Sequence, residues 1–68
     1  MHPLIQMLED KRAHLQLTKR AFAVEYLKIT EDSYSIWLRN FPSRLTNKSK
    51  ENIANVLEMS IDTINELA

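Results

Sequence analysis

The sequence predicts an all-α fold: a compact domain of five short helices with no strand. The chain contains no glycine, no run that alternates apolar and polar residues, and no Asn-Gly or Asp-Gly pair that would close a β-hairpin. Threonine or serine also precedes several apolar-periodic segments, as is typical of helix N-caps. With 68 residues the chain has room for one domain, which we place at residues 1–68.

The first helix is predicted from about Pro3 to Gln16, because proline suits the first helical position, where its missing N–H costs nothing. Apolar residues from Ile5 to Leu15 recur at helical spacing, which predicts an inward stripe with the Arg12 stem at its edge. We expect His2, which precedes this helix, to be a loose terminal residue rather than a metal ligand.

Thr18 is the predicted cap of the second helix, whose sequence is KRAFAVEYLK. Its inward face is predicted to hold Phe22, Ala23 and Tyr26, which stand at i, i+1 and i+4.

Thr30 is the predicted cap of the third helix, and Pro42 is expected to end it. Tyr34, Trp37 and Phe41 recur at i, i+3 and i+7, so we assign this aromatic stripe to the core. With these residues turned inward, at least one of the apolar neighbours should point outward; they are Ile36 and Leu38.

Thr46 and Ser60 are the predicted caps of the fourth and fifth helices. The apolar residues of these helices at helical spacing are Ile53, Val56 and Leu57 in the fourth and Ile61, Ile64 and Leu67 in the fifth. We favour a core role for the last three residues, with a homodimer seam as the alternative.

Charge is distributed unevenly along the chain, although the net charge is zero. All nine basic residues lie between residues 11 and 50, where only three acids occur, so this region carries +6 and its flanks −6. A neutral protein can therefore present a basic face, which is the usual electrostatic footprint of a nucleic-acid binder.

Catalytic and metal chemistry are poorly supported. The chain has no cysteine, its two histidines are isolated, and no glycine is available for a phosphate-cradling loop. The carboxylates show no paired catalytic spacing. We expect neither an enzyme nor a bound cofactor. The start of the chain does not resemble a signal peptide and no apolar run approaches the ~20 residues of a membrane span, so we expect a cytoplasmic protein.

The order of the helices resembles the lambda-repressor-like family of helix-turn-helix regulators, which includes the Cro and Xre types. The segments that carry the resemblance are LQLTKRAFA at the start of helix two, ITEDSYSIW at the turn and helix three, and NIANVLEMSIDTINEL over the last two helices. The helix-turn-helix unit would span about residues 18–41. The resemblance implies a prokaryotic or phage transcriptional regulator that binds double-stranded DNA in a sequence-specific way, with helix 30–41 in the major groove.

Residue by residue, the resemblance assigns two groups of DNA contacts. The predicted phosphate contacts are Lys19, Arg20, Arg39, Arg44 and Lys48. The predicted base readers are Glu31, Asp32, Ser33 and Ser35. An acid can serve as a reader because it accepts a hydrogen bond from cytosine N4. Glu31 and Asp32 have an equally good structural explanation, because acids in a first turn favour the positive end of the helix dipole.

The chain departs from the family pattern at three positions. Lys19 stands where a glutamine is usual, and Glu58 where the late turn usually has glycine. The glycine that commonly closes helix two is missing, and Leu27 and Lys28 occupy this place with one extra residue. A helix without a glycine C-cap must take a less favourable backbone or end differently, so the angle to helix three is left open.

The acids at the tip of helix three favour a second hypothesis, in which the chain is a degenerate helix-turn-helix that binds a protein. Its partner would contact helix three at Glu31, Asp32, Ile36 and Leu38.

Overall fold

Every regular element of the chain is a helix, as the sequence predicts. The computed structural model describes residues 1–68 throughout. The elements are, in chain order, α1 (Pro3–Leu15), α2 (Lys19–Ala21), η1 (Phe22–Leu27), α3 (Glu31–Asn40), α4 (Asn47–Leu57) and α5 (Ile61–Leu67). The short α2 continues directly into η1, a segment of π-helix, and the two together form helix two. The chain therefore folds into five helices.

All four predicted N-caps are confirmed. In each, a side-chain oxygen accepts a hydrogen bond from the backbone N–H three residues later, which satisfies one of the free donors of a helix start. The pairs are Thr18 with Ala21, Thr30 with Ser33, Thr46 with Ser49 and Ser60 with Thr63.

A fifth cap corrects the expectation for His2, which is not a loose residue. Its Nδ1 accepts a hydrogen bond from the backbone N–H of Leu4 at 3.1 Å. Its ring also packs edge-on against Phe41, with 4.6 Å between ring centroids. The start of α1 is therefore held against the end of α3.

The core takes apolar side chains from all five helices. Its members are Leu4, Ile5, Leu8, Phe22, Ala23, Leu27, Tyr34, Trp37, Ile53, Ala54, Val56 and Ile64. The predicted aromatic stripe of α3 is confirmed: Tyr34 and Trp37 are buried, and Phe41 packs on the core at its edge. Trp37 and Phe41 meet edge to face with centroids 5.6 Å apart, a favoured geometry for aromatic rings.

Two core predictions are wrong. Tyr26 is 41% exposed, and the residue that turns inward is its neighbour Leu27, which is fully buried. Ile61, in the first turn of α5, is 39% exposed, whereas Ile64 is buried. The shift at Tyr26 originates at the end of helix two, where the last turn is π-helical.

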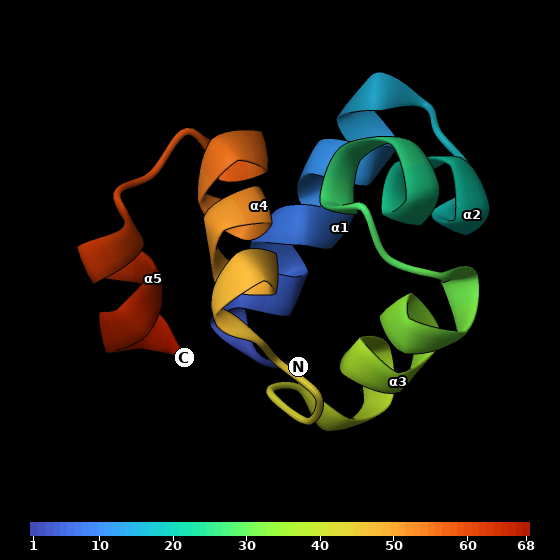
Figure 1. Cartoon of the computed structure of the whole chain (residues 1–68). Coiled ribbons are helices and arrows are strands. Elements are labelled where there is room, and N and C mark those ends of the chain that lie inside the picture. Colours follow the sequence, from blue (N-terminus) through green and yellow to red (C-terminus); the bar gives the residue numbers. More distant parts are fainter.

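The helices divide the molecule into two sides around α1. Figure 1 shows helix two and α3 on one side of α1, and α4 with α5 on the other. α5 packs against α4 and α1 and lies far from the start of α3. The loop between α3 and α4 passes close to the N-terminus. No helix has the length and apolar character needed to cross a membrane.

One buried polar atom in the core has no hydrogen-bond partner. It is the indole nitrogen, Nε1, of Trp37, in a side chain that is only 1% exposed. Buried donors are nearly always satisfied, so this orphan is a local weakness in an otherwise apolar core.

Candidate functional site

Helix two and α3 are joined by a connection of only three residues, Lys28 to Thr30. Thr30 adopts an extended backbone and caps α3, so the new helix begins directly after this short connection. The first turn of α3 then presents Glu31 and Asp32, both exposed, next to the capping threonine. The connection therefore fixes where the acidic tip of α3 stands relative to helix two.

The last turn of helix two contains one residue more than the last turn of an ordinary α-helix. Lys28 takes a left-handed backbone, with φ 59° and ψ 37°, and its N–H reaches back five residues to the carbonyl of Ala23. The N–H of Ile29 binds the same carbonyl at 3.0 Å. In this wider turn Leu27 takes the buried position, and Tyr26 stays stacked on Phe22 but leaves 41% of its surface exposed.

α4 secures this widened end through a buried hydrogen bond. The side-chain nitrogen Nδ2 of Asn52 donates to the carbonyl of Leu27 at 3.0 Å. Asn52 is itself only 9% exposed. A carbonyl at a helix end has no partner within its own helix, so this bond satisfies a group that would otherwise be buried without one.

α3 is tied to α1 by a second polar cluster. Arg12 Nε and the hydroxyl of Tyr34 both donate to the same Glu9 oxygen, the latter at 3.3 Å. Arg12 Nη1 also donates to the carbonyl of Leu17 at 3.0 Å. Burial, then the negative charge of Glu9, raises the pKa of Tyr34, and the hydrogen bond to Glu9 raises the pKa of Arg12. Arg12 thus lies at the edge of the core, as predicted, and has a structural role.

Most of the predicted phosphate-contact residues are exposed and lack an acidic partner. The four that form no ion pair are Lys19, Arg20, Arg39 and Arg44. They stand at the start of helix two, the end of α3 and the loop that follows it. The fifth residue, Lys48, lies 3.8 Å from Glu51, but both side chains are mostly in solvent and such a pair contributes little.

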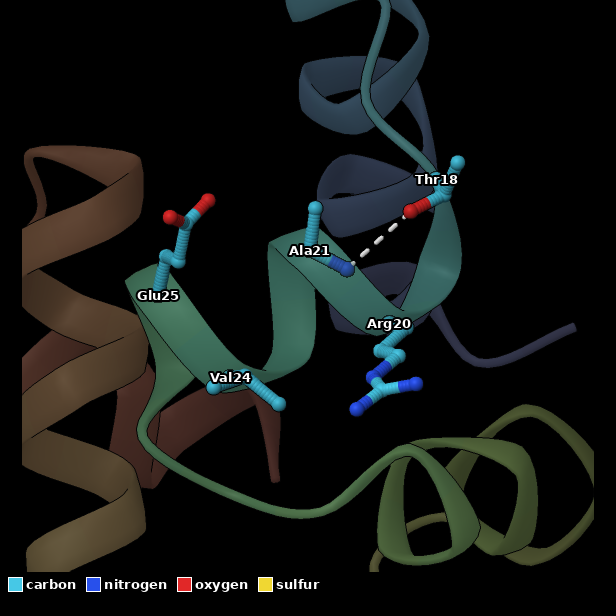
Figure 2. A pocket seen from close by; sticks show the side chains of 5 residues that line it. All are labelled: Thr18, Arg20, Ala21, Val24 and Glu25. Atoms are coloured by element: carbon cyan, nitrogen blue, oxygen red, sulfur yellow. Dashed lines mark hydrogen bonds between the residues drawn. The ribbon is translucent and has the colours of Figure 1, made fainter.

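Figure 2 shows the outer side of helix two, where Arg20 and Glu25 point in different directions. The guanidinium of Arg20 extends toward the side on which α3 lies, whereas Glu25 points away from it. A shallow hollow of about 300 Å³ runs along this surface, lined by Thr18, Arg20, Ala21, Val24 and Glu25. Glu25 therefore does not neutralise Arg20.

The side chains of the predicted base readers differ in exposure and in hydrogen bonding. Glu31 and Asp32 are exposed and form no hydrogen bond or ion pair through their side chains. Ser33 is half-buried, and its hydroxyl accepts a hydrogen bond from Thr30 at 3.1 Å. Ser35 is half-buried as well. The two acids are thus the most accessible groups on the first turn of α3.

The apolar residues of α3 do not form an exposed patch. Ile36 and Leu38 are both half-buried, and Leu38 packs against the core whereas Ile36 does not. Ile36 is therefore the one of the pair that points away from the core. It offers α3 a single apolar contact outside the fold.

Two of the last three acids of the chain lie on the other side of the molecule. Asp62 and Glu66 lie on α5, apart from α2 and α3, whereas Glu58 follows α4 and lines a hollow together with Glu25 and Tyr26 of helix two. Two acids of the flanks lie beside basic residues instead, Glu9 at Arg12 and Glu51 at Lys48, so the charges are only partly separated in space.

Sequence reasoning missed two features of this region. The sequence showed one extra residue at the end of helix two, but it did not predict that a π-helical turn would accommodate this residue. The bond from Asn52 to Leu27 joins residues 25 positions apart, and its only local sign is a polar residue before the inward Ile53.

No three histidine, cysteine, aspartate or glutamate side chains lie close enough to hold a metal ion. No family, curated protein or solved structure matches this chain.

Proposed function

We propose that this protein is a sequence-specific DNA-binding transcriptional regulator with a lambda-repressor-like helix-turn-helix. Helix two, the connection at residues 28–30 and α3 would form the helix-turn-helix, with α3 in the major groove. One observation carries the proposal: exposed cations without acidic partners flank both ends of this unit, at Lys19, Arg20, Arg39 and Arg44.

Phosphate contacts supply the attraction in this mechanism. Each lysine or arginine that replaces a condensed counterion on a phosphate contributes binding free energy that depends on salt. Lys48, at the start of α4, adds a fifth contact beside a helix N-terminus whose free N–H groups favour anions. Asn52 would hold the widened end of helix two and with it the pose of α3.

Base recognition would come from the first turn of α3. The carboxylates of Glu31 and Asp32 repel phosphates but accept hydrogen bonds from cytosine N4, a donor in the major groove. Ser33 and Ser35 would make the remaining contacts. The basic flanks set affinity and the acidic tip sets preference, because phosphate contacts position a protein while base contacts specify the sequence.

The proposal is tested by fluorescence anisotropy of a labelled mixed-sequence duplex at several salt concentrations. We expect log affinity to fall linearly with log salt, by about 0.9 per phosphate contact. The variant Arg20→Gln/Arg44→Gln should flatten this slope by about 0.9 for each phosphate that is no longer neutralised. The control variant Lys11→Gln removes a charge on α1, outside the proposed contacts, and should leave the slope unchanged.

The alternative function is a degenerate helix-turn-helix that binds a protein through α3. The exposed acids Glu31 and Asp32 and the unpacked Ile36 favour it. Absence of duplex binding even at low salt would reject the regulator and leave this alternative. Amide chemical shifts would then locate a protein partner on α3.

A homodimer through α5 would suit a regulator that reads two half-sites. The exposure of Ile61 on α5 supports it. Sedimentation equilibrium should detect the dimer, and Ile61→Asp should abolish it while the monomer stays folded, because this side chain is not a core residue.

A further inference from the structure

A second surface of the molecule has the shape and chemistry of a docking groove. It is a hollow of about 400 Å³ between α1, η1 and α4, here named the tyrosine groove. Its lining residues are Lys11, Leu15, Glu25, Tyr26, Asn55, Val56 and Glu58. None of them belongs to α3.

The widened end of helix two creates the wall of this groove. Because Leu27 takes the buried place, Tyr26 is turned outward and exposes 41% of its surface. The ring is held in place by stacking on Phe22, with centroids 5.7 Å apart and planes 29° apart. An aromatic face fixed on a π-helical segment is thus presented to the groove, and such segments are frequent at functional sites.

The charges of the groove favour a cation. Glu25 and Glu58 are exposed, come from different elements, and form no ion pair. Lys11 is the single cation of the lining, so carboxylates outnumber ammonium groups two to one. A phosphate would be repelled here, which separates this surface from the proposed DNA contacts.

We propose that the tyrosine groove binds an arginine side chain presented by a segment of a partner protein. A guanidinium is planar and stacks on an aromatic face, and its fork of donors matches a carboxylate. Its methylene stem would lie on Leu15 and Val56, the apolar residues of the lining. Lysine fits less well, because its compact ammonium is more strongly hydrated and makes no bidentate pair.

This inference goes beyond the proposed function and does not depend on it. The lining residues and the proposed DNA contacts share no member, so a partner could occupy the groove while α3 is in use. A regulator of this design could be joined to a second protein on its operator.

The test is a titration of the ¹⁵N-labelled full chain with three capped tetrapeptides that share the frame Ala-Leu-X-Ala. X is arginine, its neutral isostere citrulline, or lysine. We expect the arginine peptide to shift the amides of Glu25, Tyr26 and Glu58, and the citrulline peptide to bind about tenfold more weakly, because it lacks the charge-assisted pair. The lysine peptide should fall between them.

Two variants locate the binding. Glu25→Gln/Glu58→Gln should weaken the arginine peptide about tenfold, since both changes are at exposed positions and spare the fold. Asp62→Asn/Glu66→Gln removes the same charge outside the groove and should bind the peptide as the parent chain does. Salt-dependent binding of duplex DNA is measured on the same samples and is expected to persist in both variants.

Three results would overturn the proposal. Equal affinity for the arginine and citrulline peptides would remove the role of charge. Equal weakening by the two charge variants would show diffuse attraction to any acid. Shifts of the groove amides with protein concentration alone, without peptide, would assign the groove to a second copy of the chain.

Discussion

Helix two and α4 end in similar ways, and the comparison between them shows how one residue reshapes this protein. Each helix has an alanine in its last turns and then stops at a residue with a left-handed backbone, Lys28 in one and Glu58 in the other. Glycine normally takes such positions, because it has no Cβ to clash with the following carbonyl.

The two ends differ in the hydrogen bond that closes them. After α4, the N–H of Met59 binds the carbonyl of Ala54, five residues back. After helix two, the N–H of Ile29 binds the carbonyl of Ala23, six residues back. An ordinary Schellman closure spans five, so helix two holds one residue more and takes it up as a π-turn. With this surplus residue, Leu27 is the buried residue and the ring of Tyr26 is partly exposed.

The largest difference in stability between the two ends is expected when one residue is deleted at each. Deletion of Tyr26 should restore an α-helical turn, because Leu27 would then stand four residues after Phe22 and stay inward. We expect the fold to survive with a destabilisation of less than about 2 kcal/mol, in line with a single surface change plus the removal of one stacked ring. Urea unfolding followed by circular dichroism measures it.

Deletion of Asn55 in α4 is the matched control. It should abolish folding, because each residue of an α-helix adds roughly 100° and the deletion would rotate Val56 and Leu57 away from the core. Equal destabilisation by both deletions would mean that the π-turn does not absorb a surplus residue.

A leucine precedes the left-handed residue at both helix ends. The next largest difference in stability is expected when each leucine is truncated to alanine. Leu27 is fully buried, whereas Leu57 is half-buried. Leu27→Ala should cost about 2–5 kcal/mol, as buried leucines do, and Leu57→Ala clearly less. Equilibrium denaturation of both variants gives the two values, and a larger destabilisation at Leu57 would contradict the burial described for the widened end.

The helix starts and the inner face of α3 could be predicted because their signals are local. A threonine or serine cap needs only the N–H three residues later, and the aromatic stripe from Tyr34 follows directly from helical periodicity. The inward residue of helix two could not be predicted in this way. An α-helical period selects Tyr26, while the choice of Leu27 depends on a turn type that apolar spacing does not encode.

In the candidate site, too, the sequence predicts local features but not those that depend on distant residues. The clustering of basic residues is visible in the sequence, but the lack of ion pairs at Arg20 and Arg44 depends on where distant acids lie in space. The bond between Asn52 and Leu27 is also a long-range contact. Sequence periodicity likewise assigned Ile61 to the core, although α5 turns it to solvent.

Asn52 links the two helices compared above, so its replacement tests whether the widened end needs support. Asn52→Leu should cost about 1–3 kcal/mol, because the carbonyl of Leu27 would be buried without a donor. Asn55→Leu, at an exposed position of the same helix, is the control and should change stability little. Thermal unfolding monitored by circular dichroism compares them. An unchanged midpoint for Asn52→Leu would show that water or a backbone shift replaces the bond.

The smallest effects are expected from placing glycine at the two left-handed positions. Glu58→Gly should stabilise the fold by about 0.5–1 kcal/mol, since glycine adopts this backbone without the penalty of a Cβ. Lys28→Gly should gain less, because Lys28 Nζ also donates to the carbonyl of Glu25 at 2.8 Å. Chemical denaturation of both variants checks the order, and reduced stability of Glu58→Gly would contradict the left-handed backbone at this position.

The fluorescence of Trp37, whose buried indole N–H has no hydrogen-bond partner, reports on the packing of α3. Trp37 is the single tryptophan of the chain, and it is buried with no acceptor for its N–H. Its fluorescence should be emitted at short wavelength while α3 is packed, and should shift to the red when water reaches the ring. A duplex or a protein that pulled α3 off the core would therefore change the colour of the emission, whereas docking in the tyrosine groove would leave it unchanged.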